Sequence, residues 1–199
     1  MRSLRFRFAT SAVLLSALAG CGSHTAPRLS DSLGERLVLQ PADMPGFQQF
    51  DSGRQRRSDA YSGPRKDPAR FGRQDGWKAR YRRGGGPTTR GPLVVDSRVD
   101  VFGDMQGAKR DLAAYEADYE QQAKTVGARS VAVPRIGDDT RAWLIKQGAV
   151  RNGVETFAVA WRDGRTTASI TANGFTRGLR LTDIVALARK QQNHLAASR

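Results

Sequence analysis

Few residues in this chain have side chains suited to chemistry, and the first among them is a single cysteine. Cys21 is the only thiol in 199 residues, so no disulfide can form within the chain. An unpartnered thiol is available as a nucleophile or as a point of attachment. The two histidines, His24 and His194, lie far apart in the sequence and have no partners for a zinc site or a Ser-His-Asp triad. We expect both to be plain surface residues.

The carboxylates offer one further candidate site. Asp96 and Asp100 flank Arg98 on one face of a predicted strand, with neighbours about 7 Å apart. Two carboxylates can hydrolyse a glycosidic bond, but their alternation with an arginine favours an exposed ion-pair ladder. The adjacent Asp138 and Asp139 are more typical of a tight turn than of a calcium loop, which needs a longer run of oxygen ligands. We therefore predict no enzyme activity, no metal site and no cofactor.

The N-terminus accounts for the lone cysteine. Residues 1–20 contain three arginines followed by an uncharged run from Phe8 to Ala19. That run is shorter than the roughly 20 residues that span a bilayer, and it predicts a secretory signal. Its end, Leu18-Ala19-Gly20-Cys21, resembles the lipobox of bacterial lipoproteins, which implies cleavage before Cys21 and a diacylglycerol on its sulfur. The alternative is an ordinary secreted protein with an unmodified cysteine.

These boundaries divide the chain into three predicted segments. They are a signal peptide at 1–20, a tether at 21–30 and a single domain at 31–199. Removal of the signal leaves 179 residues, enough for one domain with its own core. A diacyl anchor would hold that domain on the extracytoplasmic side of the membrane, in the cell envelope.

Basic residues gather between positions 54 and 90 of a chain whose formal net charge is +14. Outside a bacterial membrane such a surface attracts anionic lipids or wall polymers, and export argues against nucleic acid as a partner. Charge runs are also common on plain solvated surfaces, and the excess of 27 arginines over six lysines is typical of a GC-rich genome. The glycine-rich stretch 84–92 predicts a flexible hairpin connection that binds an anion weakly. The candidate anion-binding residues are Arg54, Arg56, Arg57, Arg80, Arg82 and Arg83.

Alternation of apolar and polar residues predicts the sheet that positions these side chains. Residues 76–82 place Trp77 and Tyr81 on an apolar face, and residues 93–103 run back antiparallel to them. A meander follows, with strands at 140–150, 155–162 and 165–174 and a further strand left open at about 129–135. The dipeptides Asn152-Gly153 and Asp163-Gly164 favour type I′ hairpin turns between these strands.

Helical spacing predicts three helices, at about 31–39, 105–126 and 183–198. We expect Asp104 to cap the second helix, Gly127 to end it and Thr182 to cap the third. The second helix should turn Met105, Ala108, Leu112, Tyr115, Tyr119 and Val126 inward, and Glu116, Asp118 and Glu120 outward. Residues 48–75, poor in apolar side chains, predict a polar basic loop. The order α-β-β-α-β-β-β-α indicates an α+β domain with an antiparallel sheet of five to six strands and helices packed on it.

The sheet also carries the aromatic residues that would line a ligand cavity. Trp77, Tyr81 and Trp161 are the candidates, although large aromatics at strand spacing are more often part of a core. The second sheet face must be covered by a helix, by the polar loop or by a ligand.

Two stretches suggest a family. Residues 39–47, LQPADMPGF, resemble the opening of secreted actinobacterial-type lipoproteins and sensor domains, and Ile136 to Arg165 is similar to their later half. The resemblance implies a PsbP-like α/β/α sandwich or the fold of the extracellular domain of a mycobacterial sensor kinase. It implies no reaction and no catalytic residues.

Together these features predict a lipid-anchored, non-catalytic domain that binds a ligand or partner at the cell envelope. A module that associates with polyanions or membrane surfaces through residues 54–83 is the alternative. A cell-envelope hydrolase is disfavoured.

Overall fold

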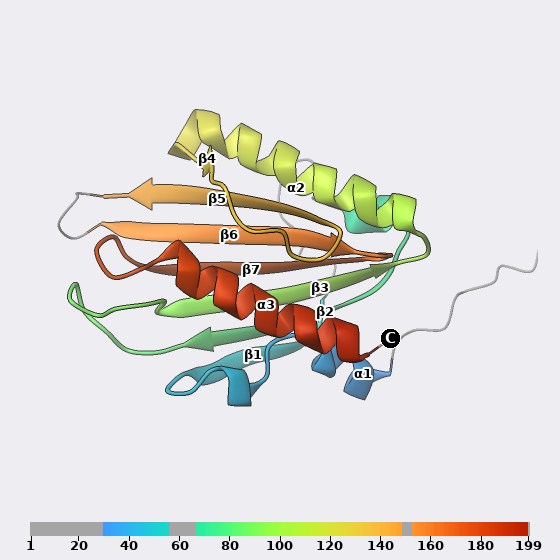
Figure 1. Cartoon of the computed structure of the whole chain (residues 1–199), viewed down its shortest axis with the longest axis horizontal. Helices are drawn as coiled ribbons and strands as arrows, with labels where there is room; N and C mark the ends of the chain where they lie inside the picture. Colours follow the sequence, from blue (N-terminus) through green and yellow to red (C-terminus); the bar gives the residue numbers. More distant parts are fainter. Residues whose placement is uncertain (1–29, 56–66, 149–152, 199) are drawn as a thin grey trace, which may run out of the picture.

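A curved antiparallel sheet with helices on both faces organises the chain (Figure 1). The computed structural model describes residues 30–55, 67–148 and 153–198. The strands are β1 (Gln48–Arg54), β2 (Arg73–Arg82), β3 (Val94–Phe102), β4 (Arg129–Ser130), β5 (Asp139–Gln147), β6 (Val154–Asp163) and β7 (Thr166–Phe175). The helices are α1 (Asp31–Arg36), α2 (Met105–Val126) and α3 (Leu181–Ala197). The strand order is β1-β2-β3-β7-β6-β5-β4, and every neighbouring pair is antiparallel.

The α+β class is confirmed, but the described residues contain seven strands instead of five to six. The short β4 accounts for one of them, and β1 accounts for another. β1 lies in the segment predicted as a loop, and β2 begins three residues before its predicted start. β1 is an edge strand with mostly exposed polar side chains, so it lacks the alternating apolar residues by which a strand is recognised.

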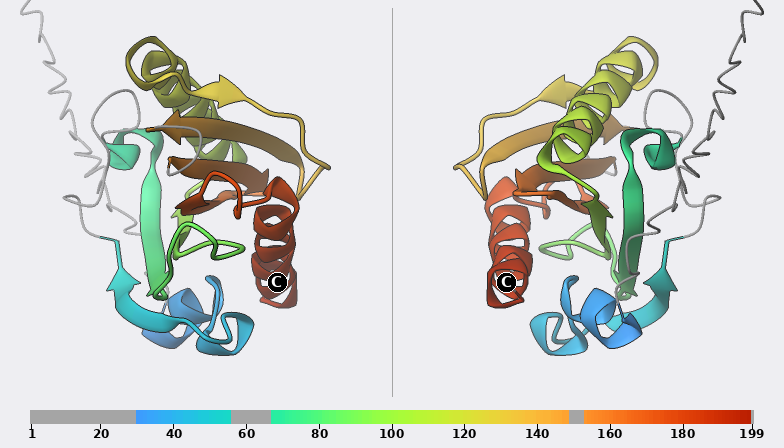
Figure 2. Two further views of the ribbon diagram at one scale, coloured as in Figure 1. Left: turned by 90° about the vertical axis from the view of Figure 1, so that its left-hand side faces the viewer. Right: turned by 90° about the vertical axis from the view of Figure 1, so that its right-hand side faces the viewer.

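The main core lies on the concave face of the sheet, where α3 packs (Figure 2). Trp77 and Tyr81 of β2 lie opposite Val99 and Val95 of β3, as the alternation predicted. The fully buried side chains on this face include Val95, Val99, Val159, Trp161, Ile170 and Ile184. Burial of each side chain of this size stabilises the fold by about 1.5–3 kcal/mol.

Helix α2 covers part of the opposite face, and both of its predicted ends are confirmed. The side chain of Asp104 accepts a hydrogen bond from Gly107 N at 2.7 Å, and Gly127 ends the helix with a φ of 68°. Leu112 and Tyr115 pack on β5 and β6, in a small cluster with Trp143, Ala158 and Ala160.

The predicted inward face of α2 is wrong at three positions. Met105 is 57% exposed and Val126 is 40% exposed, whereas Asp118, expected outside, is buried. Met105 is the first residue of the helix and Val126 the last, and the buried residues of α2 lie between them, from Gly107 to Asp118. The strand face beneath α2 is partly polar, which allows acidic side chains to point inward: Thr167 Oγ1 donates to Asp111 Oδ2 at 2.6 Å.

Two local expectations are corrected at the other end of the chain. In the β6–β7 hairpin only Gly164 has a positive φ, of 58°, at the first central position, which is the pattern of a type II′ turn. Helix α3 begins one residue before Thr182, and its N-cap is Arg180, which makes no side-chain cap hydrogen bond. Within the described ranges, no helix is long and apolar enough to cross a membrane.

Candidate ligand-binding groove

An apolar groove lies between the segment 43–47, helix α3 and the start of the β2–β3 connection. Its volume is about 330 Å³. Met44, Phe47 and Leu187 form the apolar floor, and they pack against the main core. Charged groups of both signs surround this floor. The lining residues are Asp43, Met44, Pro45, Phe47, Arg83, Pro92, Asp183, Ala186, Leu187 and Lys190.

Hydrogen bonds fix the 40–43 wall of this groove. Asp43 Oδ2 accepts from Gln40 N at 2.8 Å, which closes the turn Pro41–Asp43 on itself. The same oxygen lies 2.7 Å from His194 Nε2, and Lys190 Nζ donates to Asp43 O at 3.1 Å. The wall is therefore tied to α3, and the prediction that His194 is a plain surface residue is wrong.

A chain of buried polar groups holds the same segment to the sheet from below. Leu39 N donates to Ser97 Oγ at 3.0 Å, and that hydroxyl donates to Gln191 Oε1 at 2.9 Å. Gln191 Nε2 in turn donates to Arg98 O at 2.8 Å. Each of these polar groups finds its hydrogen-bond partner inside the protein. The three hydrogen bonds therefore fix the position of α3 and of the groove wall.

Tyr81 completes this support. Its hydroxyl donates to Leu39 O at 2.6 Å, and its side chain is fully buried. Burial, reinforced by the negative charges of Asp43 and Glu35, raises the pKa of Tyr81 to about 12. The phenol therefore stays neutral and remains a donor throughout the neutral range.

A second depression lies at the opposite end of α3. It has a volume of about 420 Å³, and its lining includes Leu33, Leu37 and Leu195. Two of the charged groups at its edge already have partners: Asp138 Oδ2 accepts from Arg162 at 2.6 Å, and Asp163 Oδ2 from Gln192 at 2.7 Å. We take the groove at residues 43–47, whose apolar floor packs on the main core, as the candidate site.

The structure separates the basic residues that the sequence grouped into one patch. Arg54 is paired with Asp31 at 2.8 Å and with Asp75, and these hydrogen bonds raise the pKa of Arg54. Arg54 lies opposite Trp77 in β2, about 17 Å along the sheet from Arg82. Among the described candidates, Arg54 therefore lies apart from the others.

The remaining predicted arginines lie toward the far end of β2. Arg80 lies 3.4 Å from Asp96, and its guanidinium and that of Arg82 flank the ring of Phe50, at 5.1 and 5.4 Å from the ring centre. Arg83 instead lies over Phe47 at 4.9 Å, on the rim of the groove.

The predicted carboxylate ladder is partly wrong. Arg98 pairs with Asp96 at 2.8 Å, but Asp100 pairs with Arg73 at 3.0 Å. Arg98 is 7% exposed and Asp100 is 1% exposed, so this ladder is buried instead of exposed. Asp138 does stand in a turn, where it also accepts from Gly164 N at 2.9 Å.

The aromatic candidates lie in the core. Trp77, Tyr81 and Trp161 are each less than 10% exposed and belong to the main apolar cluster. None of them lines the groove at residues 43–47. Their role as ligand-lining residues remains a prediction. Cys21, His24, Arg56 and Arg57 lie outside the described residues, as does Asn152.

Sequence reasoning missed the groove because its walls are distant in the chain. Phe47, Pro92 and Leu187 belong to three segments that only the sheet and α3 bring together. The stretch LQPADMPGF, which resembles the opening of secreted actinobacterial-type lipoproteins, supplies one wall of the groove. The apolar residues Met44 and Phe47 within a proline- and glycine-containing segment were the available signal.

Comparisons with known proteins support the fold alone. No protein-family model matches the chain, and no curated protein matches its sequence. Among solved structures, the extracellular domain of PknH from Mycobacterium tuberculosis is similar, with a TM-score of 0.58 and 12% identity over 86% of this chain and 98% of that chain. The expected likeness to a mycobacterial extracellular domain is thus confirmed for the fold. Likeness to PsbP-like sandwiches stays a prediction.

Proposed function

We propose that this protein is a non-catalytic, ligand-binding module on the extracytoplasmic side of a bacterial membrane, held there by a lipid on Cys21. The groove at residues 43–47 is the binding site. The observation that carries this proposal is a preformed apolar floor surrounded by charged groups of both signs. Such a site suits a small amphiphile, with its apolar part on Phe47 and Leu187 and its polar part at the rim.

Two observations support the location. Residues 18–21 have the small-residue pattern that precedes a lipidated cysteine, after a cationic start and a short apolar run. The fold is also one found in an extracellular domain.

The arrangement of the carboxylates supports binding over hydrolysis. A glycosidase needs two carboxylates facing each other across a cleft. Here Asp96, Asp100 and Asp138 each face an arginine, at 2.6–3.0 Å. Their ion pairs hold strands and turns together, which is a structural role.

Filling the groove should abolish binding of an amphiphilic probe. Ala186 lines the groove and is itself exposed, so Ala186→Trp adds volume there without removing a core contact. We expect the full chain, purified in a mild detergent below its micelle concentration, to bind anilinonaphthalene sulfonate saturably, and the variant to bind it at least tenfold more weakly. Fluorescence titration measures both affinities.

Ala113→Trp is the matched control, because Ala113 is exposed on α2, away from the groove. Its affinity should equal that of the unmodified chain, and both variants should keep a cooperative thermal transition. Equal binding by the Ala186→Trp variant and the unmodified chain would contradict the proposed site.

Cys21→Ser tests the anchor separately. We expect the unmodified chain to be labelled by radioactive palmitate and recovered in the membrane fraction, and the variant to lose both properties. A variant that still carries label and stays with the membrane would show that the anchor lies elsewhere.

A further inference from the structure

We propose that the end of the domain formed by the β2–β3 and β7–α3 connections docks a linear, phosphate-bearing polymer of the cell envelope. Five arginines, here called the arginine pole, lie on or next to these connections: Arg82 ends β2, Arg83 and Arg90 follow it in the β2–β3 connection, and Arg177 and Arg180 belong to the β7–α3 connection. This surface adjoins the groove, with which it shares Arg83, and its proposed occupant goes beyond the ligand binding proposed above. The choice of a cell-envelope polymer as the occupant rests on the proposed lipid anchor at Cys21. Whether the arginine pole binds a polyanion can be measured without that anchor.

Backbone contacts hold the two connections together. Gly91 N donates to Gly178 O at 2.8 Å, and Leu93 N donates to Asn173 O at 2.8 Å. A side chain at Gly178 would place its Cβ 2.0 Å from Thr89 O, so only glycine permits this approach. In the left panel of Figure 2 the two connections lie side by side and face the viewer.

Arg83 further fixes the pole. Its Nε donates to Pro92 O at 2.7 Å, and its guanidinium also donates to Arg90 O. Arg83 therefore closes the β2–β3 connection from inside. The other four side chains are exposed on the surface of this end.

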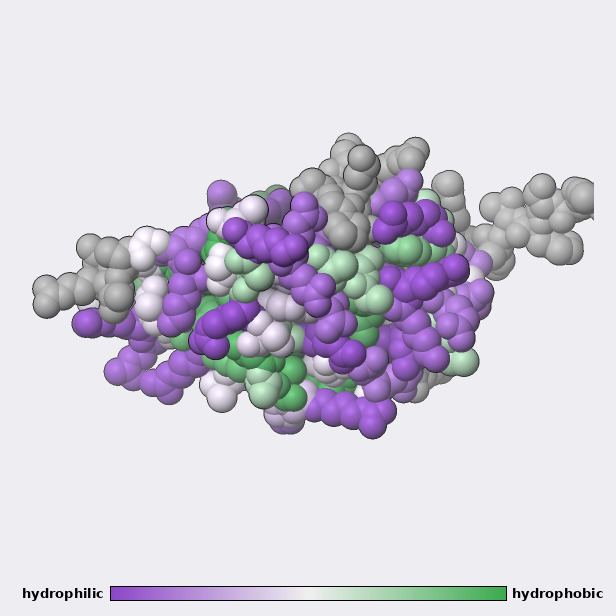
Figure 3. Space-filling view, turned by 90° about the horizontal axis from the view of Figure 1, so that it is seen from above, coloured by the Kyte–Doolittle hydropathy of each residue, from purple (hydrophilic) through white to green (hydrophobic). Residues whose placement is uncertain are grey.

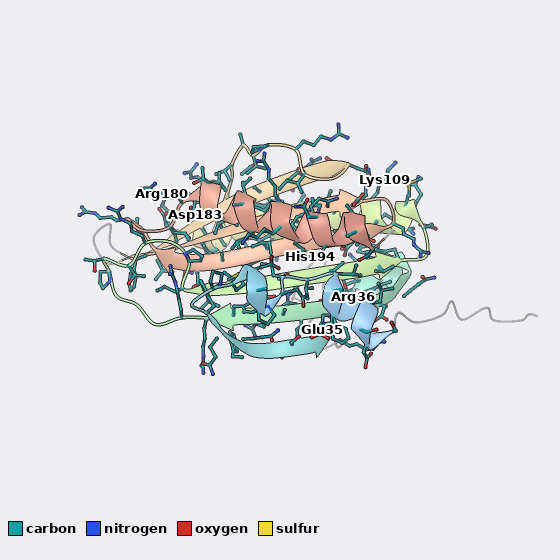
Figure 4. All side chains as sticks on the ribbon, turned by 60° about the horizontal axis from the view of Figure 1, so that its bottom comes forward. Glu35, Arg36, Lys109, Arg180, Asp183 and His194 are labelled. Carbon is teal, nitrogen blue, oxygen red and sulfur yellow. The ribbon has the colours of Figure 1, made fainter. Side chains whose placement is uncertain are left out.

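The pole has a net positive charge. Within residues 30–55, 67–148 and 153–198, none of the five arginines forms a salt bridge, whereas Arg73, Arg80 and Arg98 on the sheet do. Asp183 is one acidic group at this end, and Figure 4 shows it next to Arg180 at the start of α3. Glu155 is buried and already paired with Lys146 at 2.7 Å. Figure 3 shows hydrophilic side chains protruding at the left-hand end of the molecule.

The position of the pole favours a polymer over the bilayer. Helix α3 has 17 residues and is about 25 Å long. Arg180 stands at its start, whereas its last turn borders the same depression as Leu33 and Leu37, where the chain enters the fold. Figure 1 shows the β2–β3 and β7–α3 connections at the opposite end of the domain from the C-terminus. The arginines thus lie at the end of the domain opposite the point where the chain enters the fold.

The spread of the arginines favours several linked anions. A guanidinium binds a phosphate through two parallel hydrogen bonds, and five of them on two connections cannot converge on one small anion. A chain of phosphates neutralises them together and releases its condensed counterions. Each contact should then contribute about 0.7 to the slope of log affinity against log salt concentration, which gives about 3.5 for five contacts.

Polyphosphate binding by the full chain in non-ionic detergent tests the proposal. The test variant carries Arg90→Gln, Arg177→Gln and Arg180→Gln, whose side chains donate no hydrogen bond within the described residues. Arg83 is kept because it closes a connection. We expect calorimetric titration to show at least tenfold weaker binding and a salt slope lower by about 2.

The matched control removes the same charge elsewhere, with Arg110→Gln, Arg129→Gln and Arg135→Gln on the α2–β4 side. Its binding should stay within about twofold of the unmodified chain. If both variants lost affinity for polyphosphate equally, net charge alone would explain the binding, and the proposal would be overturned. The proposal would also be overturned if the unmodified chain did not bind polyphosphate.

Competition by vesicles distinguishes the occupants. Phosphatidylcholine and phosphatidylglycerol vesicles take up a lipid anchor equally, so only contact between the pole and lipid headgroups makes their effects differ. We expect neither to displace polyphosphate. Displacement by phosphatidylglycerol alone would mean that the pole faces the bilayer, and the polymer would be the wrong occupant. Because this competition needs no particular location in the cell, its outcome is independent of the Cys21→Ser experiment.

Discussion

Replacing Trp161 by alanine is expected to lower the free energy of unfolding by about 3–5 kcal/mol. The indole is fully buried at the centre of the main core, and its Nε1 donates to Gln192 Oε1 at 2.7 Å. Truncation leaves a cavity and removes that hydrogen bond. Chemical denaturation of the full chain, followed by circular dichroism, measures the loss.

Met105→Ala is the matched truncation at an exposed site, since Met105 is 57% exposed. Its effect should stay within about 0.5 kcal/mol. The comparison also tests the prediction that Trp161 lines a ligand cavity. If Trp161→Ala removed probe binding while leaving the unfolding free energy unchanged, the indole would belong to a binding site instead of the core.

Tyr81→Phe is expected to produce the second largest change, and one that depends on pH. Near neutral pH the variant should be less stable by about 1–3 kcal/mol, because Leu39 O loses its donor. The pKa of Tyr81 is about 12 in the folded protein and about 10 in an unfolded chain, so the folded state favours the neutral phenol. Its stabilising effect is complete below pH 10 and is lost as the pH rises toward 12.

The measurement is the difference in unfolding free energy between the unmodified chain and the variant across that range. Other groups that titrate there are common to both proteins and cancel. The difference should shrink by about 2–3 kcal/mol between pH 10 and pH 12. A constant difference would show that the phenol ionises equally easily in the folded and unfolded states.

Local signals predicted much of the fold. Asp104 and Gly127 marked the ends of α2 because capping depends on neighbouring residues alone. Alternation assigned Trp77 and Tyr81 to the apolar face because a strand with one covered face must alternate. β1 escaped recognition because its outer edge and most of its side chains lie in solvent, which leaves no apolar pattern.

The charged residues were harder to assign, since their environment depends on distant segments. Nothing near Asp100 in the sequence reveals that Arg73 pairs with it, or that Gln55 lies over its strand. Similarly, Arg177 and Arg180 lie some ninety positions after Arg83 and join it only because the strand order sets β7 beside β3. The sequence therefore shows which residues are charged, but it does not show which of these charges form ion pairs.

The polar edge of the sheet has a consequence for how copies of this protein coexist. β1 carries glutamine, aspartate and arginine, and its register with β2 shifts between Gln49 and Asp51. An interrupted, charged border is a poor template for strand addition by a neighbour. Copies of this protein at high local concentration should thus not associate by pairing their β1 edges.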